Sequence, residues 1–418
     1  MLTEFEEGSI ATRRLILRDA LSILSLVLGT VVLFAITLLL FRSFSAHRTS
    51  LAQKWSQQGR NALDAGRPDE AIVALRTALL YKPGDSNYEL LLAEALDKAG
   101  HTDESYQYFM GLWDAQPGNG QVNLELARLA ARRKDRAAAV NFYRASIYGT
   151  WEGDGVARRA DVRLELAGYL IAGHDLPAAR LELLIAGGNA PDDYDRDMAI
   201  GNLLQQAQDP ADAWAYYLRA SARRPNDPAA HAAAGRLAYD AGDYENAVRM
   251  LARAHAELAA SHTATPRDFD DRTMLENAER ILELLPSPGL PARDRVEHVL
   301  AARAIAHRRF EACSAQLEPA TQQPAKDERS AAAAAVPAAL QALAARWSGP
   351  DGTSSAAALL RDPGEQGAAM QLVYDTEIQT DKLCGVPTGD DALLFRLATT
   401  PQTSLPAEKA EQANVPRD

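Results

Sequence analysis

The side chains that could do chemistry in this sequence are few, and they are not grouped as catalysis requires. Cys384, in the turn-like segment Cys384-Gly385-Val386-Pro387, is the one position where a nucleophile can be proposed. A reactive thiolate needs a nearby histidine, lysine or helix N-terminus to lower its pKa, and only Lys382 is close in sequence. We therefore expect a protein that is not an enzyme, with chemistry around Cys384 as an alternative.

The other candidate ligands and nucleophiles are also scattered. His298 and His307 are nine positions apart on one expected helix, whereas a metal-binding pair on a helix is four apart. No phosphate loop, dinucleotide fingerprint, zinc-protease motif or nucleophile elbow occurs in the sequence. We expect no catalytic residue, no metal site and no cofactor.

The two cysteines, Cys313 and Cys384, leave two interpretations open. They are too few for a disulfide scaffold, and their separation fits no metal-ligand spacing. They would be able to pair if the domain lies in an oxidising compartment. Two buried free thiols are equally compatible with the sequence.

The composition indicates an all-α protein that does not bind nucleic acid. Hydrophobic residues make up 47% of the 418 residues but aromatic residues only 6%, and much of the apolar share is alanine, a strong helix former. The formal net charge of -12 argues against general affinity for nucleic acid, because binding to phosphates requires a basic surface.

Residues 20–41 form a run of 22 positions without a charged side chain. As a helix this run spans about 33 Å, which matches a hydrocarbon core of roughly 30 Å. We predict a transmembrane helix. A cleavable signal peptide is disfavoured because its apolar core would be shorter, and a twin-arginine export signal, suggested by Arg13 and Arg14, is disfavoured by the strong hydropathy of the run.

The orientation in the membrane rests on a nearly balanced distribution of basic residues. Arg13, Arg14 and Arg18 are packed just before the helix, whereas the basic residues after it are more widely spaced. We expect residues 1–19 to be a short cytoplasmic tail and the large domain to lie outside, which is the periplasm in a bacterium. A cytoplasmic domain is the alternative.

Residues 52–261 repeat with a period of 34. The first unit carries Trp55, Gly59, Ala62, Gly66, Ala71, Leu75, Ala78 and Pro83, and five further units follow in register, with a short glycine-bearing insertion near 148–157. This pattern resembles the tetratricopeptide repeat family. The resemblance implies an α-solenoid, a right-handed superhelix of helix pairs, in which small residues such as Gly59 let the two helices of a unit approach closely.

The resemblance also implies where a partner binds. In this family, ligands lie in the concave groove, on outward-facing residues of the first helix of each pair. The corresponding positions here are Arg60, Glu94, Arg128, Asn202, Arg236 and Tyr239. The lysine and asparagine set that clamps a C-terminal carboxylate in chaperone-binding members is absent, which disfavours that class of ligand.

Beyond the regular units the pattern weakens. Residues 262–327 are expected to form a degenerate repeat region, with a seventh unit over 293–317, and 328–398 a helical region interrupted by a Gly/Pro/Ser-rich linker at 348–364. The segment 399–418 is expected to be a disordered tail.

We therefore predict a single-pass membrane scaffold or adaptor that binds a protein or peptide through the concave face of its solenoid, within a cell-envelope complex. Two alternatives remain: an accessory subunit or exported enzyme that carries its chemistry around Cys384, and a passive structural spacer.

Overall fold

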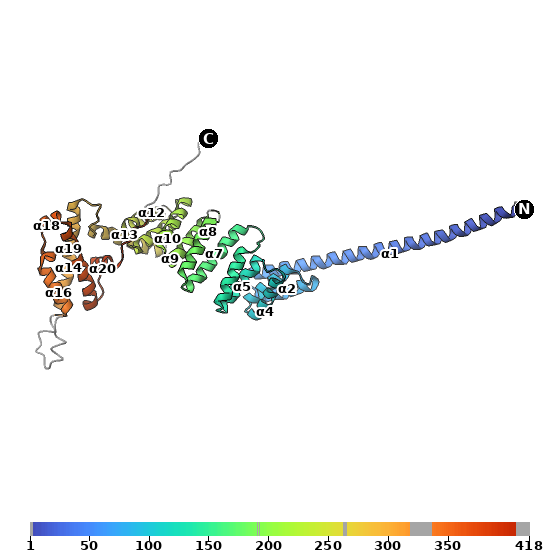
Figure 1. Cartoon of the computed structure of the whole chain (residues 1–418), viewed down its shortest axis with the longest axis horizontal. Coiled ribbons are helices and arrows are strands. Elements are labelled where there is room, and N and C mark those ends of the chain that lie inside the picture. Colours follow the sequence, from blue (N-terminus) through green and yellow to red (C-terminus); the bar gives the residue numbers. More distant parts are fainter. Residues whose placement is uncertain (1–2, 190, 192, 262–265, 318–336, 407–418) are drawn as a thin grey trace, which may run out of the picture. The chain divides into compact units, whose positions relative to one another are not determined.

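The computed structural model of the protein describes residues 3–189, 191, 193–261, 266–317 and 337–406. Within these ranges every regular element is helical (Figure 1). The strand-like pairing there is limited to one isolated bridge between Asn119 and Thr150. The all-α fold class predicted from the composition is confirmed. The helices form two compact units, residues 1–162 and 163–418.

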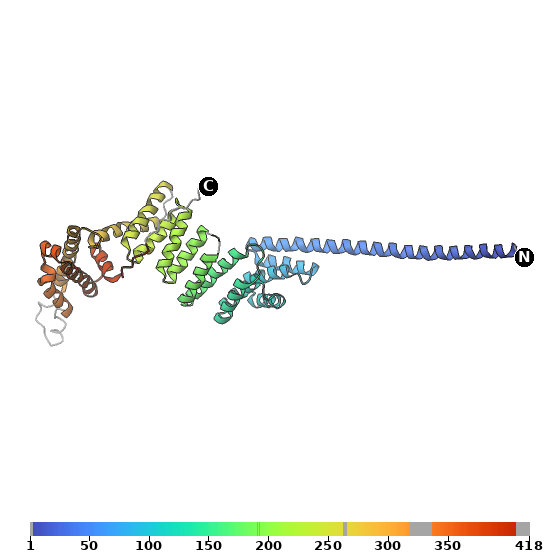
Figure 2. The same ribbon diagram turned by 45° about the horizontal axis from the view of Figure 1, so that its top comes forward.

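The first unit begins with one very long helix. α1 (Thr3–Asp64) has 62 residues and carries both the apolar run and the first helix of the first repeat without a break (Figure 2). The sequence separates these two parts at residues 42–51, but nothing between them ends a helix, because no proline or glycine lies in that stretch. The candidate transmembrane segment is therefore continuous with the first helix of the first repeat, and no flexible linker separates the two.

Consecutive helices after α1 pack as pairs. The first unit continues with α2 (Pro68–Tyr81), α3 (Ser86–Lys98), α4 (Thr102–Ala115), α5 (Gly120–Arg132) and α6 (Arg136–Tyr148), and α7 (Gly155–Ala172) contains the boundary between the units. The second unit continues with α8 (Leu176–Asn189), α9 (Tyr194–Gln206), α10 (Pro210–Arg223), α11 (Pro228–Asp240) and α12 (Tyr244–Ser261).

Local sequence signals set the ends of these helices. Asp85, Asn119, Asp135 and Asp227 cap helix N-termini by accepting hydrogen bonds from backbone N–H groups that have no partner inside the helix. The turn inside each pair has a residue in the left-handed conformation at the same repeat position: Gly66, Gly100, Lys134, His174, Gln208 and Gly242. The period of 34 therefore holds through six pairs, interrupted once between Lys134 and His174.

The interruption is an ordered insertion. Trp151 packs against Gly120, where an added Cβ atom would lie 2.4 Å from the indole ring. The indole nitrogen of Trp151 donates a hydrogen bond to the backbone oxygen of Ser146 at 3.0 Å. Backbone hydrogen bonds of Thr150 to Gly118 and of Gly120 to Thr150 fix the segment to the start of α5.

In three of the six pairs the two helices meet at a glycine, namely Gly59, Gly201 and Gly235, and in the other three at an alanine. A Cβ atom on Gly59 would lie 2.6 Å from Cγ of Leu75, and the same distance is found between Gly201 and the ring of Tyr217. Leu75 is fully buried, in a cluster with Ile72, Leu92 and Leu96. Burial of one such leucine contributes about 2 to 3 kcal/mol, so the glycine positions determine how closely this apolar contact can form.

The C-terminal part of the second unit departs from the repeat pattern. It contains α13 (Pro266–Leu284), α14 (Ala292–Leu317), α16 (Ala338–Ser348), α17 (Pro350–Thr353), α18 (Ala356–Arg361), α19 (Pro363–Cys384) and α20 (Asp390–Thr399). The expected seventh repeat over 293–317 is wrong, because α14 is one continuous helix that packs against α19 and not a helix pair.

Two further expectations for this region are corrected. The predicted linker 348–364 contains the short helices α17 and α18, and α19 begins at its end; Pro350 and Pro363 occupy first-turn positions, where the missing N–H is not needed. The expected disordered tail is ordered from Thr400 to Pro406, because Leu405 is buried and the N–H of Thr403 bonds the backbone oxygen of Ala241. Residues 407–418 lie outside the described part of the chain.

The glycine contact yields a prediction for stability. Gly59→Ala introduces a methyl group into the space held by Leu75, and we expect it to lower the free energy of unfolding of the first unit by about 1 to 3 kcal/mol. Gly111→Ala, on an exposed helical glycine with no atom within 4 Å of the new Cβ, is the control, and we expect a gain of about 0.5 to 1 kcal/mol. Urea unfolding followed by circular dichroism measures both values. Equal effects of the two substitutions would contradict the close packing at Gly59.

Candidate protein-binding surface

Three of the predicted groove residues come together in the first unit. Arg60 on α1, Glu94 on α3 and Arg128 on α5 occupy the same repeat position, one residue after the small residue at the contact within each pair. The three side chains lie close enough for the charges of Arg60 and Arg128 to act on Glu94. We call this surface, made by Arg60, Glu94 and Arg128 together with Lys98 and Gln121, the inner face of the first unit.

Burial and charge oppose each other at Glu94. Burial raises the pKa of Glu94 above its usual range, whereas Lys98, Arg128, Arg60 and a hydrogen bond from Gln121 lower it, and the effect of burial is the largest. One half-buried carboxylate therefore lies among three cationic side chains. Glu125, which is paired with Arg128, adds a second carboxylate, so the three cationic and two acidic side chains carry one net positive charge when both carboxylates are ionised.

Neighbouring residues hold Arg128 in place. Nη1 of Arg128 donates to Oε1 of Glu125 at 2.8 Å, and Nε2 of Gln121 donates to the same oxygen at 3.0 Å. Arg60 is exposed to solvent. Sequence reasoning missed Lys98 and Gln121, although Lys98 lies one turn after Glu94 on the same helix face, which was an available signal.

The predicted groove residues of the second unit are arranged differently. Asn202 is exposed, and its Oδ1 accepts a hydrogen bond of 2.8 Å from the buried hydroxyl of Tyr217. The equivalent position of the preceding repeat is Gly168, which has no side chain. The ladder of charged groove residues is therefore not continued on α7 or α9.

The chain itself covers the last two predicted groove residues. Nη1 of Arg236 donates to both carboxylate oxygens of Asp271 on α13, at 2.8 and 2.6 Å. Tyr239 is only 6% exposed, and the guanidinium of Arg396 on α20 lies 4.0 Å from the centre of its ring. The expectation that Tyr239 faces outward is wrong, and Arg236 is committed to an intramolecular ion pair.

Cys313 on α14 and Cys384 at the end of α19 form a disulfide, with Cα atoms 5.7 Å apart. It closes a loop across 71 positions of sequence and ties together the two helices that pack most closely in this region. Cys384 therefore has no free thiolate here to act as a nucleophile. Of the two interpretations left open by the sequence, a disulfide or two free thiols, this structure has the disulfide.

A buried carboxylate lies on α19 near the disulfide. Glu377 is 0% exposed, and neither of its carboxylate oxygens has a hydrogen-bond partner among the described residues. Burial, together with the nearby charge of Asp391, raises the pKa of Glu377 to about 8. The charge of Arg309, whose Nε lies 3.3 Å from Oε2 of Glu377, lowers this pKa, but its effect is smaller than that of burial.

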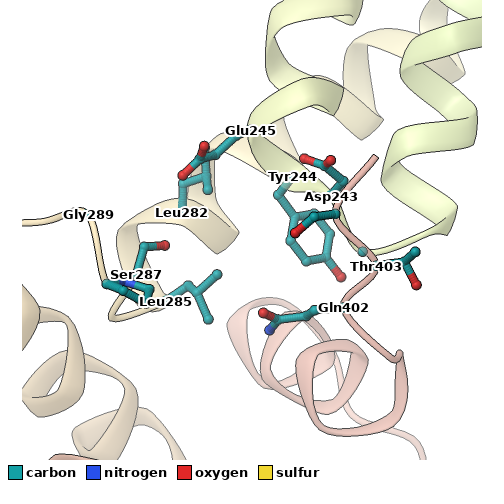
Figure 3. A pocket seen from close by; sticks show the side chains of 12 residues that line it. Asp243, Tyr244, Glu245, Leu282, Leu285, Ser287, Gly289, Gln402 and Thr403 are labelled. Atoms are coloured by element: carbon teal, nitrogen blue, oxygen red, sulfur yellow. The ribbon is translucent and has the colours of Figure 1, made fainter. Parts of the chain in front are cut away.

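A small pocket of about 190 Å³ lies where the tail meets the sixth repeat. Figure 3 shows Gln402 and Thr403 of the tail beside Asp243 and Tyr244, where α12 begins, with Leu282 of α13 and Leu285, the residue after that helix, on another side. Its volume is below that of a typical small-molecule site, 300 to 1,000 Å³. Across the described ranges, no group of three or more histidine, cysteine, aspartate or glutamate residues is placed to hold a metal ion.

The repeats match a known family. Residues 62–112 match the family model for the tetratricopeptide repeat. This chain contains tetratricopeptide repeats. The match covers α2, α3 and most of α4, which include the core around Leu75 and the Glu94 position.

Several solved tetratricopeptide repeat structures resemble the chain at low sequence identity. They include PilF of Pseudomonas aeruginosa (15% identity, TM-score 0.40, covering 54% of this chain and 99% of that one) and PilW, a type IV pilus biogenesis factor (14%, 0.39, 51% and 98%). A third is YrrB, described as having an unusual peptide-binding site (14%, 0.36, 50% and 98%). No curated protein matches the chain by sequence.

The buried carboxylate predicts a pH dependence of stability. The pKa of Glu377 is about 8 in the folded chain and near 4.5 in the unfolded chain. Between pH 4.5 and pH 8 the folded chain therefore keeps a proton on Glu377, whereas the unfolded chain has released it. The contribution of Glu377 to the free energy of unfolding is complete below about pH 4.5. It decreases as the pH rises toward 8, by at most about 1.4 kcal/mol per pH unit. Glu377→Gln removes this slope in thermal unfolding. An unchanged slope in the variant would contradict the assignment.

Proposed function

We propose that the chain is a membrane-anchored scaffold that binds an acidic segment of a partner protein or peptide on the inner face of the first unit. Tetratricopeptide repeats make it a protein-interaction scaffold. The observation that carries the finer proposal is the convergence of Arg60, Glu94 and Arg128, from three different helices, on one positively charged surface.

The chemistry of this surface favours a carboxylate ligand. Arginine guanidinium groups bind carboxylates through two parallel charge-assisted hydrogen bonds, and arginine is enriched among the residues that dominate binding energy. Glu94 keeps the two arginines from repelling each other and supplies an acceptor for a donor on the ligand. An acidic peptide that also offers backbone N–H groups fits this arrangement better than a basic one does.

The membrane anchor is supported by the exposed apolar part of α1. Each large apolar side chain from Leu21 to Phe41 is at least 44% exposed, and the apolar window has no share buried against protein. So large an apolar surface is not tolerated in water. The hydroxyls of Ser22, Ser25, Thr30 and Thr37 all donate to backbone oxygens of their own helix, as hydrocarbon requires of polar groups.

The disulfide supports a location outside the cytoplasm. Structural disulfides persist in oxidising compartments such as the periplasm and are rare where thiols are kept reduced. The disulfide therefore favours the orientation with the large domain outside over the cytoplasmic one, whereas the distribution of basic residues is nearly balanced between them. Alkylation of cells lysed directly into a denaturant that contains the reagent, before and after reduction, measures it: we expect Cys313 and Cys384 to react only after reduction, and alkylation without reduction would favour the cytoplasmic orientation.

The two alternatives are less well supported. An enzyme with chemistry at Cys384 would need a free thiolate, and this sulfur is bonded to Cys313. A passive spacer does not account for three convergent charged side chains on one face. Nevertheless, a spacer makes a clear prediction, since it has no partner that depends on Arg60 or Arg128.

The proposal is tested by reversing the charge of the inner face. Arg60→Glu combined with Arg128→Glu should reduce recovery of crosslinked partners from native membranes at least tenfold, because each charge-assisted hydrogen bond contributes about 1.5 to 3 kcal/mol. Arg144→Glu, which reverses one charge at an exposed position on the second helix of the third pair, is the control and should have little effect. Partners retained equally by both variants would contradict binding at this surface, and a complete absence of specific partners would favour the spacer.

A further inference from the structure

The end of the first repeat that lies nearest the apolar segment carries exposed apolar side chains. α2 runs antiparallel to α1, so its last turn packs beside the part of α1 that follows the apolar run, and Nη2 of Arg48 donates to the backbone oxygen of Leu80 at 3.2 Å. Leu80 is 75% exposed and Phe44 is 63% exposed. Neither belongs to the apolar run, and neither contributes to the core of the repeat.

The charged side chains of α1 near this end are all basic. From residue 20 to residue 63 the sequence has no aspartate or glutamate, but it has Arg42, His47, Arg48, Lys54 and Arg60. The guanidinium of Arg48 lies 5.9 Å from the centre of the Phe44 ring. On α2 the acidic residues, Asp69 and Glu70, are in the first turn, at the opposite end from Leu80.

On an upright helix this end lies a few ångströms beyond the lipid headgroups, and a tilt of α1 toward α2 brings the tip of α2 to their height. Arg48 is seven residues beyond Phe41, which corresponds to about 10 Å along a continuous helix. The headgroup layer on each side of a bilayer is about 5 to 7 Å thick. A typical tilt of about 20°, with helix axes about 8 to 10 Å apart, lowers the tip of α2 by about 3 Å and brings Leu80 into that layer.

We propose that the last turn of α2, with Leu80, and the segment of α1 from Phe44 to Arg48 form a second membrane contact, which takes anionic phospholipid headgroups. This contact rests on the proposed anchoring by α1 and adds to it. Leucine and phenylalanine enter the headgroup boundary, and Arg48 faces the phosphates. Lys82 contributes little charge, since it is paired with Asp85 at 2.7 Å. The contact fixes the tilt of the first repeat, and with it the direction in which the inner face is presented.

The chain offers a matched pair of positions for the test. Val73 lies seven residues before Leu80 on the same face of α2, is 66% exposed, and lies about 10 Å farther from the membrane. Since Cys313 and Cys384 are bonded to each other, Leu80→Cys and Val73→Cys each provide one free thiol for an environment-sensitive fluorophore. The full chain is reconstituted in phosphatidylcholine vesicles with and without phosphatidylglycerol, and quenching by a headgroup spin-labelled lipid is measured.

We expect quenching at position 80 to be at least twofold stronger than at position 73, and stronger with phosphatidylglycerol than without. Arg48→Glu and the milder Arg48→Gln should both reduce it, whereas Lys54→Glu, on an exposed residue six positions farther from the membrane, should not. Equal quenching at positions 80 and 73 in vesicles that carry the protein would overturn the second contact. Equal quenching in both lipids would overturn the assignment to anionic headgroups. A chain that does not float with vesicles would instead overturn the anchoring itself.

Discussion

The continuity of α1 is the constraint on which the rest of this account depends. One helix of 62 residues carries the apolar segment at one end and the first helix of the first repeat at the other. A flexible linker would let the repeats rotate freely above a membrane. A continuous helix does not, because each residue fixes its neighbours through backbone hydrogen bonds, so the apolar segment orients the inner face that carries Arg60.

The two units differ in whether helices of the same chain cover the groove positions of their repeats. In the first unit, the residues that follow the small contact positions are charged, and they form the inner face at which we propose that a partner binds. In the second unit, the corresponding face is covered by helices of the same chain, through the Arg236–Asp271 ion pair and the stacking of Arg396 on Tyr239. The C-terminal helices thus serve as an end cap that satisfies the last repeats, as terminal elements of solenoids must.

Much of the fold is visible in the sequence because it depends on local signals that recur. The spacing of Gly59, Gly201 and Gly235 predicts close helix contacts, and an added Cβ atom at each would lie 2.6 Å from its neighbour. The alternation of Arg60, Glu94 and Arg128 at one repeat position likewise predicts a shared surface. The period predicts these contacts because equivalent positions of each unit pack in the same way.

What the sequence did not show depends on contacts between distant residues. Arg396 stacks on Tyr239 across 157 positions of sequence, and no local pattern records that pairing. Similarly, the order of the tail depends on Leu405 and on Asp243, which accepts its N–H at 2.8 Å. Composition suggested a loop at 348–364, but Pro350, Ser355 and Pro363 are also residues that start helices.

The most direct test of this account is a distance along α1 in a bilayer. Spin labels at Ala20→Cys and Lys54→Cys, in the full chain held in lipid nanodiscs, report this distance by double electron–electron resonance, and the bonded natural cysteines do not react with the label. A continuous helix places these positions about 51 Å apart, and we predict a single narrow distribution near that value. A broad distribution with a shorter mean would show a hinge between the apolar segment and the repeats, and would contradict the account.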